Sequence, residues 1–328
     1  MPCVEVEAPA KVNLFLRVLG RRGDGYHELE TVFFALSLSD RVTLRETGSG
    51  LEVRADRAGV PSGQSNLCYR AASLLWQRAI AEERGRARQA LGLRVHITKR
   101  IPVGAGLGGG SSDAAATLVG LNRLWDLGFS LSELEAAAAQ VGSDVPFCLR
   151  GGTALGRGRG ERLEPLPAPP PAWLVVAEPG FRVSTPVAYA WLDQLRSAPP
   201  RGARGRPPRP EPAVGAMVEA LRSQDLRLVA AALYNSFEAA VLPRYPLVAR
   251  IRDALLAAGA LGALMSGSGP AVFALAADES SAAVLARSVQ GLARRVFVVP
   301  ATQAVPGPGG KESPAAPPNS SAITREGK

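Results

Sequence analysis

The sequence has few of the residues that build metal sites and disulfide frameworks. Its 328 residues include two histidines and three cysteines, Cys3, Cys68 and Cys148. The cysteines are far apart in the chain, and their spacing does not fit a zinc site. Three cysteines are also too few for a disulfide framework. We therefore expect a fold that is held together by a hydrophobic core, with no cluster of metal ligands.

Long apolar runs are missing as well. No apolar stretch reaches the ~18 residues that a membrane-spanning helix requires. The first residues also lack the basic segment, apolar segment and small-residue cleavage site of a secretory signal. Hydrophobic residues still make up 46% of the chain, which is enough for one large domain or two modest ones. We therefore expect a soluble cytoplasmic protein, as a monomer or a homodimer.

Aromatic residues are scarce, at 5% of the chain, although the net charge is +9. Proteins that bind nucleic acid usually gather arginines on one helix face or among stacking aromatics. Many arginines here lie instead in sequence rich in Pro and Gly, such as residues 197–214. We predict no nucleic-acid partner and no membrane partner, and we attribute the remaining charge to an anionic small-molecule substrate.

Proline and glycine mark the predicted domain boundaries. A proline run at 165–171 separates an N-terminal domain, residues 1–164, from a C-terminal domain, residues 165–300. Residues 197–214 are too poor in apolar side chains to build a core and are predicted to be a flexible insertion. The Pro, Gly and Ser content of residues 301–328 predicts a disordered tail.

Alternating and helical patterns predict the main elements. We expect two short strands broken at Ala8-Pro9, then strands at 31–38 and 41–45 on either side of Ser39-Asp40. Helical spacing follows at 66–78 and 114–125, and a capping box at Ser130-Leu-Ser-Glu133 starts a helix that ends at Gly142. Further strands are expected at 93–98, 173–177 and 295–299.

The most informative stretch runs from Pro102 to Ala115 and has five glycines between Gly104 and Gly110. Glycine adopts positive φ without strain, so successive N–H groups can turn toward one concavity where an anion binds. A helix that begins near Ser111 or Ser112 would direct its unpaired first N–H groups to the same point. The stretch therefore indicates a phosphate-binding loop. It is not a Walker loop, because no Gly-Lys-Ser/Thr follows.

The order Pro-x-Gly-x-Gly-Leu-Gly-x-x-Ser-Ser resembles the nucleotide loop of the GHMP kinases, which include galactokinase, homoserine kinase and mevalonate kinase. The resemblance implies an α+β fold of two domains, one ribosomal-protein-like and one a ferredoxin-like α/β sandwich, with the active site in the cleft between them. It implies that ATP binds with Mg²⁺, whose ligands it does not identify. The implied nucleotide-binding residues of the loop are Pro102, Gly104, Gly106, Leu107, Gly108, Gly109, Gly110, Ser111 and Ser112.

A second motif, Gly-x-Asp-Val-Pro-Phe at 142–147, matches the family residue for residue. By spacing alone, Asp144 is a turn residue after a helix. The resemblance implies instead that Asp144 is the catalytic acid or base, that Lys11 keeps its carboxylate ionised, and that Asn13 places the substrate. Lys11 and Asn13 share one face of a predicted strand.

Other segments resemble the family's substrate and adenine sites. Tyr26 and His27, in Asp-Gly-Tyr-His-Glu-Leu, are implied to contact the cytidine end of a substrate. Thr185 and Tyr189 match a segment in which an aromatic ring stacks on cytosine, although Tyr189 also fits as an ordinary aromatic on a helix.

Asn66 is a candidate N-cap of the helix that follows it, and the resemblance adds a place beside adenine. Lys99 directly precedes the glycine-rich loop. The resemblance implies that Lys99 faces the nucleotide, and a solvated lysine fits the sequence equally well. A second glycine turn at 262–275 resembles the third GHMP motif, which approaches the loop from the C-terminal domain.

Together the motifs resemble most closely those family members that phosphorylate the 2-hydroxyl of a cytidine-diphosphate-linked methylerythritol, an ATP-dependent step toward isoprenoid precursors. Another GHMP kinase, acting on homoserine or a mevalonate-type alcohol, is the first alternative. RNA binding through the basic insertion is the second.

Overall fold

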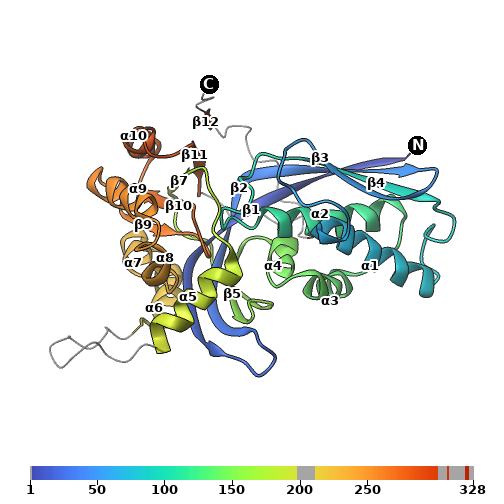
Figure 1. The fold of residues 1–328 in the computed structure, drawn as a ribbon, viewed down its shortest axis with the longest axis horizontal. Coiled ribbons are helices and arrows are strands. Elements are labelled where there is room, and N and C mark those ends of the chain that lie inside the picture. Colours follow the sequence, from blue (N-terminus) through green and yellow to red (C-terminus); the bar gives the residue numbers. More distant parts are fainter. Residues whose placement is uncertain (1, 198–210, 302–308, 310–321, 325–328) are drawn as a thin grey trace.

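Two long antiparallel strands join the two lobes of the molecule (Figure 1). The computed structural model describes residues 2–197, 211–301, 309 and 322–324. Strands β1 (Cys3–Arg21) and β2 (His27–Thr47) each replace what we expected to be two short strands. Pro9 does not break β1, because the pairing with β2 shifts between Pro9 and Lys11, and a bulge accommodates a residue without an N–H.

The first sheet has seven strands. Its central order is β3-β4-β2-β1-β8, and β5 pairs with both β2 and β6. The added strands are β3 (Gly50–Ala55), β4 (Gly92–Thr98), β5 (Thr153–Gly158), β6 (Arg162–Pro165) and β8 (Tyr234–Asn235). Strand β8 pairs in parallel with β1, so the C-terminal half of the chain also contributes to this sheet.

Four helices lie along one face of this sheet in the N-terminal lobe (Figure 1). They are α1 (Leu67–Ala81), α2 (Gly109–Leu124), α3 (Leu131–Val141) and α4 (Val145–Arg150), and a 3-10 turn (Gly63–Ser65) precedes α1. Apolar side chains of the helices and the sheet form one core. The capping box at Ser130 and the helix end at Gly142 are both confirmed.

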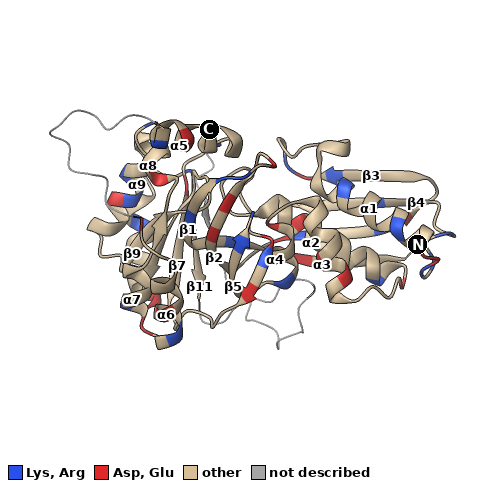
Figure 2. Ribbon diagram, turned by 90° about the horizontal axis from the view of Figure 1, so that it is seen from below, with Lys and Arg blue, Asp and Glu red and all other residues tan. Residues whose placement is uncertain are grey.

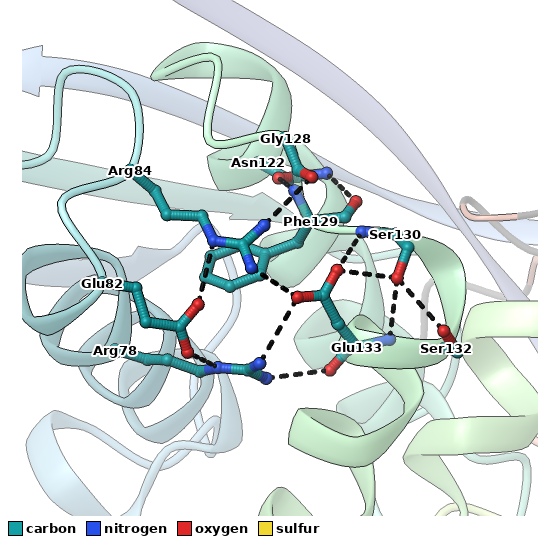
Figure 3. A network of polar contacts seen from close by, with 9 residues as sticks. All are labelled: Arg78, Glu82, Arg84, Asn122, Gly128, Phe129, Ser130, Ser132 and Glu133. Atoms are coloured by element: carbon teal, nitrogen blue, oxygen red, sulfur yellow. Dashed lines mark hydrogen bonds and ion pairs between the residues drawn. The ribbon is translucent and has the colours of Figure 1, made fainter.

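A network of ion pairs fixes the start of α3 against the end of α1 (Figure 3). The Glu133 carboxylate accepts from the Ser130 backbone and hydroxyl and pairs with Arg84, and the pKa of Glu133 is lowered to about 2 by these contacts. The guanidinium groups of Arg78 and Arg84 both lie over the Phe129 ring. The basic segment after α1 thereby helps to hold the helical layer together.

The second sheet forms the C-terminal lobe, in the order β12-β11-β7-β10-β9. Its strands are β7 (Trp173–Glu178), β9 (Gly262–Met265), β10 (Val272–Ala276), β11 (Arg295–Pro300) and β12 (Ala322–Thr324). The helices of this half are α5 (Thr185–Ser197), α6 (Gly215–Ser223), α7 (Leu226–Ala231), α8 (Glu238–Val241), α9 (Pro246–Ala257) and α10 (Glu279–Val289).

The two faces of the second sheet pack against different partners. Alternate residues such as Val175 and Val272 share a core with α9 and α10, whereas Leu174 and Phe273 share a core with Val12 of β1. Because side chains alternate along a strand, strands β7, β9, β10 and β11 each contribute to both cores. The β1–β2 pair is therefore packed directly against the C-terminal lobe.

Two predictions fall partly outside the described residues. Of the expected insertion 197–214, residues 198–210 lie outside them. Of the expected tail, residues 302–308, 310–321 and 325–328 lie outside them. The prediction of disorder is wrong for Ala322–Thr324, which pair antiparallel with Arg295–Phe297. Strand pairing uses backbone groups, so a Pro- and Ser-rich composition does not exclude it.

Within the part of the chain that is described, no helix is both long and apolar enough to cross a bilayer. Figure 2 shows that residues of both charge signs are distributed along both lobes in that view.

Candidate active site

A cleft of about 390 Å³ contains most of the residues that the sequence singled out. One wall comes from the glycine-rich loop and the start of α2, and Thr185 of α5 contributes from the C-terminal lobe. The predicted residues that line the cleft are Lys11, Asn66, Lys99, Pro102, Gly104, Gly106, Leu107, Gly108, Gly109, Gly110, Ser111, Asp144 and Thr185.

The loop is held by its carbonyl groups. The oxygen of Ala105 accepts from the amide of Ala271 (3.1 Å), that of Gly106 from the hydroxyl of Ser266 (2.9 Å), and that of Leu107 from the amide of Lys11 (2.9 Å). In a trans peptide the N–H points opposite to the C=O. The amides that follow these carbonyls therefore point away from the anchoring residues, which leaves them available to an anion in the cleft.

Close packing explains why glycine is needed in this loop. A Cβ on Gly106 would lie 2.1 Å from the carbonyl oxygen of Ser266, and a Cβ on Gly108 would lie 2.7 Å from the Lys11 side chain. Both residues have positive φ, 82° and 71°. Helix α2 starts at Gly109, earlier than we expected, because Gly108 serves as its N-cap in the left-handed conformation.

Lys11 and Asp144 meet at the floor of the cleft. The Lys11 ammonium lies 3.3 Å from the Asp144 carboxylate and donates to Oδ1 of Asn13 at 2.7 Å. The Asn13 amide in turn donates to the Thr31 hydroxyl (2.8 Å), which donates to the carbonyl of Phe15 (2.8 Å). The Lys11 side chain is 5% exposed and that of Asp144 is 33% exposed. The fixed cation therefore orients a carboxylate that remains open to the cleft.

Lys99 is buried beneath the loop rather than solvated. Its ammonium pairs with Asp113 at 2.7 Å and with Asp40, and all three side chains are 3% exposed or less. Asp40 also accepts from the amides of Arg100 (2.6 Å) and Ile101 (2.8 Å). This cluster connects the residues that enter the loop with the first turn of α2, so Lys99 holds the two ends of the loop together.

The charge balance of this cluster perturbs Asp113. Burial raises the pKa of Asp113 to about 7, although the neighbouring Lys99 ammonium works in the opposite direction. Burial alone would lower the pKa of Lys99, but Asp113 and Asp40 outweigh it and leave that pKa raised. One ammonium therefore stabilises two buried carboxylates only in part, and Asp113 retains a proton more readily than a solvated aspartate.

Three of the residues implied to contact cytidine, Tyr26, His27 and Tyr189, are not among those that line the cleft beside the glycine-rich loop. His27 stacks on Tyr189, with ring centroids 4.3 Å apart, and its Nε2 is hydrogen-bonded to Asp193 at 2.9 Å. Tyr189 also packs edge-on against Phe237. Tyr26 is 53% exposed and lies under the guanidinium of Arg159. Tyr189 follows Thr185 by one helical turn on α5, so the two share a face.

The remaining predicted residues are placed as follows. Asn66 caps α1 by accepting from the amide of Cys68 (2.8 Å) while it lines the cleft, so its expected N-cap role is confirmed. Asn13 lies behind Lys11. Ser112 is fully buried, and its hydroxyl has no hydrogen-bond partner among the described residues. Thr185 hydrogen-bonds Ser268 (2.8 Å), which belongs to the second glycine turn.

Sequence reasoning missed the partners of these residues. Four such partners had no prediction: Asp40, Asp113, Thr31 and Asp193. Asp113 lies 14 positions from Lys99, whereas the other three lie 18 or more positions from the predicted residues that they contact. Asp113 is the only acidic residue between Pro102 and Ala115, and this position within the motif is the one signal that could have indicated its role. The other three have no local pattern that distinguishes them.

Comparison with known proteins finds two family models in this chain. The model of the GHMP kinases N terminal domain matches residues 66–152, and that of the GHMP kinases C terminal matches residues 217–293. The first match contains the glycine-rich loop and Asp144. The second contains the turn that anchors Gly106.

Individual relatives match most of the chain. A 4-diphosphocytidyl-2-C-methyl-D-erythritol kinase of Exiguobacterium sibiricum is 44% identical over 295 residues, which cover 90% of this chain and 96% of that protein. A crystal structure of 4-(cytidine 5'-diphospho)-2C-methyl-D-erythritol kinase superposes with a TM-score of 0.71 at 40% identity, covering 90% of this chain and 98% of the other. The homoserine kinase of Cytophaga hutchinsonii has a TM-score of 0.69 at 21% identity, covers 98% of each chain, and shares the fold.

Proposed function

The chain belongs to the GHMP kinase family, and on that premise we propose that it transfers the γ-phosphoryl group of ATP to the 2-hydroxyl of 4-diphosphocytidyl-2-C-methyl-D-erythritol. The observation that carries the proposal is the Lys11–Asp144 pair, 3.3 Å apart, beside the glycine-rich loop. The substrate is inferred from the relatives at about 44% identity and from the aromatic cluster around Tyr189.

In the proposed reaction the loop binds the phosphates of ATP. Phosphoryl transfer passes through a loose transition state whose negative charge is spread over the phosphoryl oxygens, so fixed donors stabilise it more than proton removal does. The amides of the loop and the positive end of α2 supply such donors. The residues inferred to bind the nucleotide are those of the loop from Pro102 to Ser111 that were identified above, with Asn66 beside the adenine. Ser112 was also expected to bind it, but its side chain is fully buried and does not line the cleft.

Asp144 acts on the acceptor alcohol. Its carboxylate orients the hydroxyl and accepts the proton late, as the oxygen forms its bond to phosphorus and ADP leaves. A contribution of this kind is typically worth ~10² to 10⁴ in rate. The Lys11 ammonium, 3.3 Å from the carboxylate, fixes the direction of that carboxylate and steadies the attacking oxygen through its positive charge. Asn13 and Thr31 fix the direction of the Lys11 ammonium.

The cytidine end of the substrate is assigned to residues at the start of β2 and on α5. We infer contacts with Tyr26, His27, Thr185 and Tyr189, all of which come from two segments of the chain, 26–27 and 185–189. The hydrogen bond between Nε2 of His27 and the accepting carboxylate of Asp193 would leave the other ring nitrogen of His27 free to contact a base. Stacking on a tyrosine suits the flat, weakly polar face of a pyrimidine.

Magnesium is expected to accompany ATP. Mg²⁺ prefers oxygen ligands and is commonly bound by substrate phosphates together with one or two carboxylates. Asp113 and Asp144 are the carboxylates that line the cleft within the described residues, and Asp113 is already engaged by Lys99. Asp144 is likewise paired with Lys11 and is assigned to the alcohol, so the ligands that remain for the ion are the phosphates of ATP, to which it would supply positive charge.

The proposal is tested by a coupled assay of ADP release with three acceptors, the cytidylyl substrate, homoserine and mevalonate. We expect turnover with the first and background rates with the other two. Turnover with homoserine or mevalonate instead would assign the chain to a different member of the family. Competition by CMP against the acceptor, but not against ATP, gives an independent check of the cytidine site.

Location and partners follow from the same chemistry. Dependence on ATP and on a small phosphorylated metabolite supports a cytoplasmic protein. The alternative of RNA binding depends on residues 197–214, most of which lie outside the described residues. No observation on the described residues favours that alternative.

A further inference from the structure

Arg182, which belongs to none of the motifs above, reaches from the C-terminal lobe across two loops of the N-terminal lobe. It lies between β7 and α5, three residues before Thr185. Its Nη1 donates to the carbonyl oxygen of Gly59 at 3.1 Å. Its aliphatic part lies against Gly104, where an added Cβ would be 2.9 Å from the Arg182 Cδ. One side chain therefore contacts both the segment after β3 and the glycine-rich loop.

The position of Arg182 depends on two glycines. A Cβ on Gly59 would lie 2.4 Å from Nη2 of Arg182, too close for the guanidinium to stay where it is. Gly59 and Gly104 both have positive φ, 82° and 72°, which glycine adopts without strain. Side chains are thus absent from both loops at the points where the arginine crosses them.

The two loops form part of the cleft wall. Gly59 directly precedes Val60 and Pro61, which line the cleft, and Gly104 lines it as well. On the other lobe, Thr185 lines it from the segment that carries Arg182. A contact between Arg182 and Gly59 therefore fixes the distance between the two walls on the side of Asn66, where the adenine is expected.

The charges of Arg182 and Arg57 also support a contact between the segment before α1 and the C-terminal lobe. The Arg182 side chain is exposed, and no carboxylate among the described residues forms an ion pair with it. The pKa of Arg295 of β11 is lowered, first by burial and second by the positive charge of Arg57. The segment around Arg57 therefore lies close to the C-terminal lobe. The segment between β3 and α1 thus lies against that lobe, with Arg182 as its hydrogen-bonded contact.

We propose that Arg182 is a positioning residue for the nucleotide, which holds the 56–61 segment and Gly104 against the C-terminal lobe and so sets the affinity for ATP. The proposal rests on the proposed binding of ATP in this cleft. Arg182 does not touch the reacting atoms, so kcat and the KM for the acceptor alcohol depend on it little.

The test compares Arg182→Ala with wild type and with Arg227→Ala, a control that removes an exposed arginine of α7 that does not line the cleft. The Kd of a non-hydrolysable ATP analogue is measured by calorimetry at low and high salt. We expect Arg182→Ala to raise this Kd about tenfold, because the substitution removes one hydrogen bond from a charged donor. The increase should persist at high salt, because it acts through the position of the loop and not through long-range attraction.

A second readout reports on the loop itself. Trypsin cleavage after Arg57, located by mass spectrometry, should be faster in Arg182→Ala than in wild type and unchanged in Arg227→Ala. An unchanged Kd, or an effect that disappears at high salt with unchanged cleavage after Arg57, would overturn the proposal. If wild type itself does not bind the analogue, the proposed ATP site fails first, and the two failures are distinguishable.

Discussion

The proposed chemistry depends on one side-chain group, the ammonium of Lys11. A buried cation is stable only with partners, and Lys11 contacts Asn13 at 2.7 Å and Asp144 at 3.3 Å and lies over the Phe33 ring. Because Asn13 is itself held by Thr31, the ammonium has little freedom to move. The site therefore presents an oriented carboxylate before any substrate binds.

A single substitution at Tyr189 tests the proposed cytidine site. We expect Tyr189→Ala to raise the KM for the cytidylyl substrate about 5- to 150-fold, since the loss of one stacked base typically costs ~1 to 3 kcal/mol. The KM for ATP should change little, because Tyr189 does not line the part of the cleft formed by the loop. Steady-state kinetics with each substrate varied in turn measures both values.

Trp191→Ala is a suitable comparison for Tyr189→Ala, because Trp191 packs near Tyr245 and Arg244. Its removal should leave both KM values close to those of wild type. Equal losses of affinity for the cytidylyl substrate and ATP in Tyr189→Ala would indicate general unfolding, and would argue against a cytidine contact.

Asp113 gives a test through pH. Because burial raises its pKa from 3.8 to about 7, the folded state binds this proton more tightly than the unfolded chain does. Stability contributed by the proton is therefore lost as pH rises from about 4 to 7, by at most about 1.4 kcal/mol per pH unit. The contribution from the raised pKa of Lys99 is present throughout that range and is lost only at higher pH.

Asp113→Asn should flatten this dependence, since the amide does not titrate. Urea unfolding at several pH values between 4 and 7 gives the slope for both proteins. A variant whose stability falls with pH as steeply as that of wild type would show that another group is responsible.

At the scale of elements, the glycine-rich loop is positioned by a turn that comes from the other half of the chain. The Gly106 carbonyl accepts from Ser266, and Ala271 donates to Ala105. The binding loop and the turn that supports it are thus separated by roughly half the sequence. The similarity of 262–275 to a family motif predicted the turn but not these hydrogen bonds.

Gly106→Ala should disable the loop. The new Cβ would lie 2.1 Å from the Ser266 oxygen at a φ of 82°, so the loop has to move away from its support. We expect kcat/KM for ATP to fall by at least ~10², as small displacements of binding groups can cause. Gly215→Ala is the control, because a Cβ there meets nothing within 4 Å and φ is not positive.

Most helices and strands could be predicted from the sequence, because the signals for them come from residues that are close together in the chain. The capping box at Ser130, the N-cap at Asn66 and the phosphate loop depend on residues a few positions apart. The continuity of β1 and β2 could not be predicted, because Pro9 and Asp40 are usual strand breakers. A bulge accommodates Pro9, and distant Lys99 neutralises Asp40.

At the scale of the molecule, the core between the two lobes makes them one cooperative unit. Phe273 of β10 is fully buried in the cluster that also contains Val12 and Phe34 of the long strands. Neither sheet can separate without exposing this cluster to water. Packing of this kind depends on the assembled fold and has no signature in the local sequence.

Phe273→Ala should therefore destabilise both lobes. We expect a loss of about 3 to 5 kcal/mol and a single thermal transition at a lower Tm, observed by calorimetry. Two separate transitions, with only one shifted by the substitution, would contradict the shared core.

The central claim, that Asp144 accepts the proton of the alcohol beside a loop that binds ATP, is tested most directly by Asp144→Asn. Single-turnover transfer from ATP to the cytidylyl substrate should slow by at least ~10² while the Kd of that substrate changes little, because the amide keeps the shape but accepts no proton. Transfer at the wild-type rate in this variant would contradict the account.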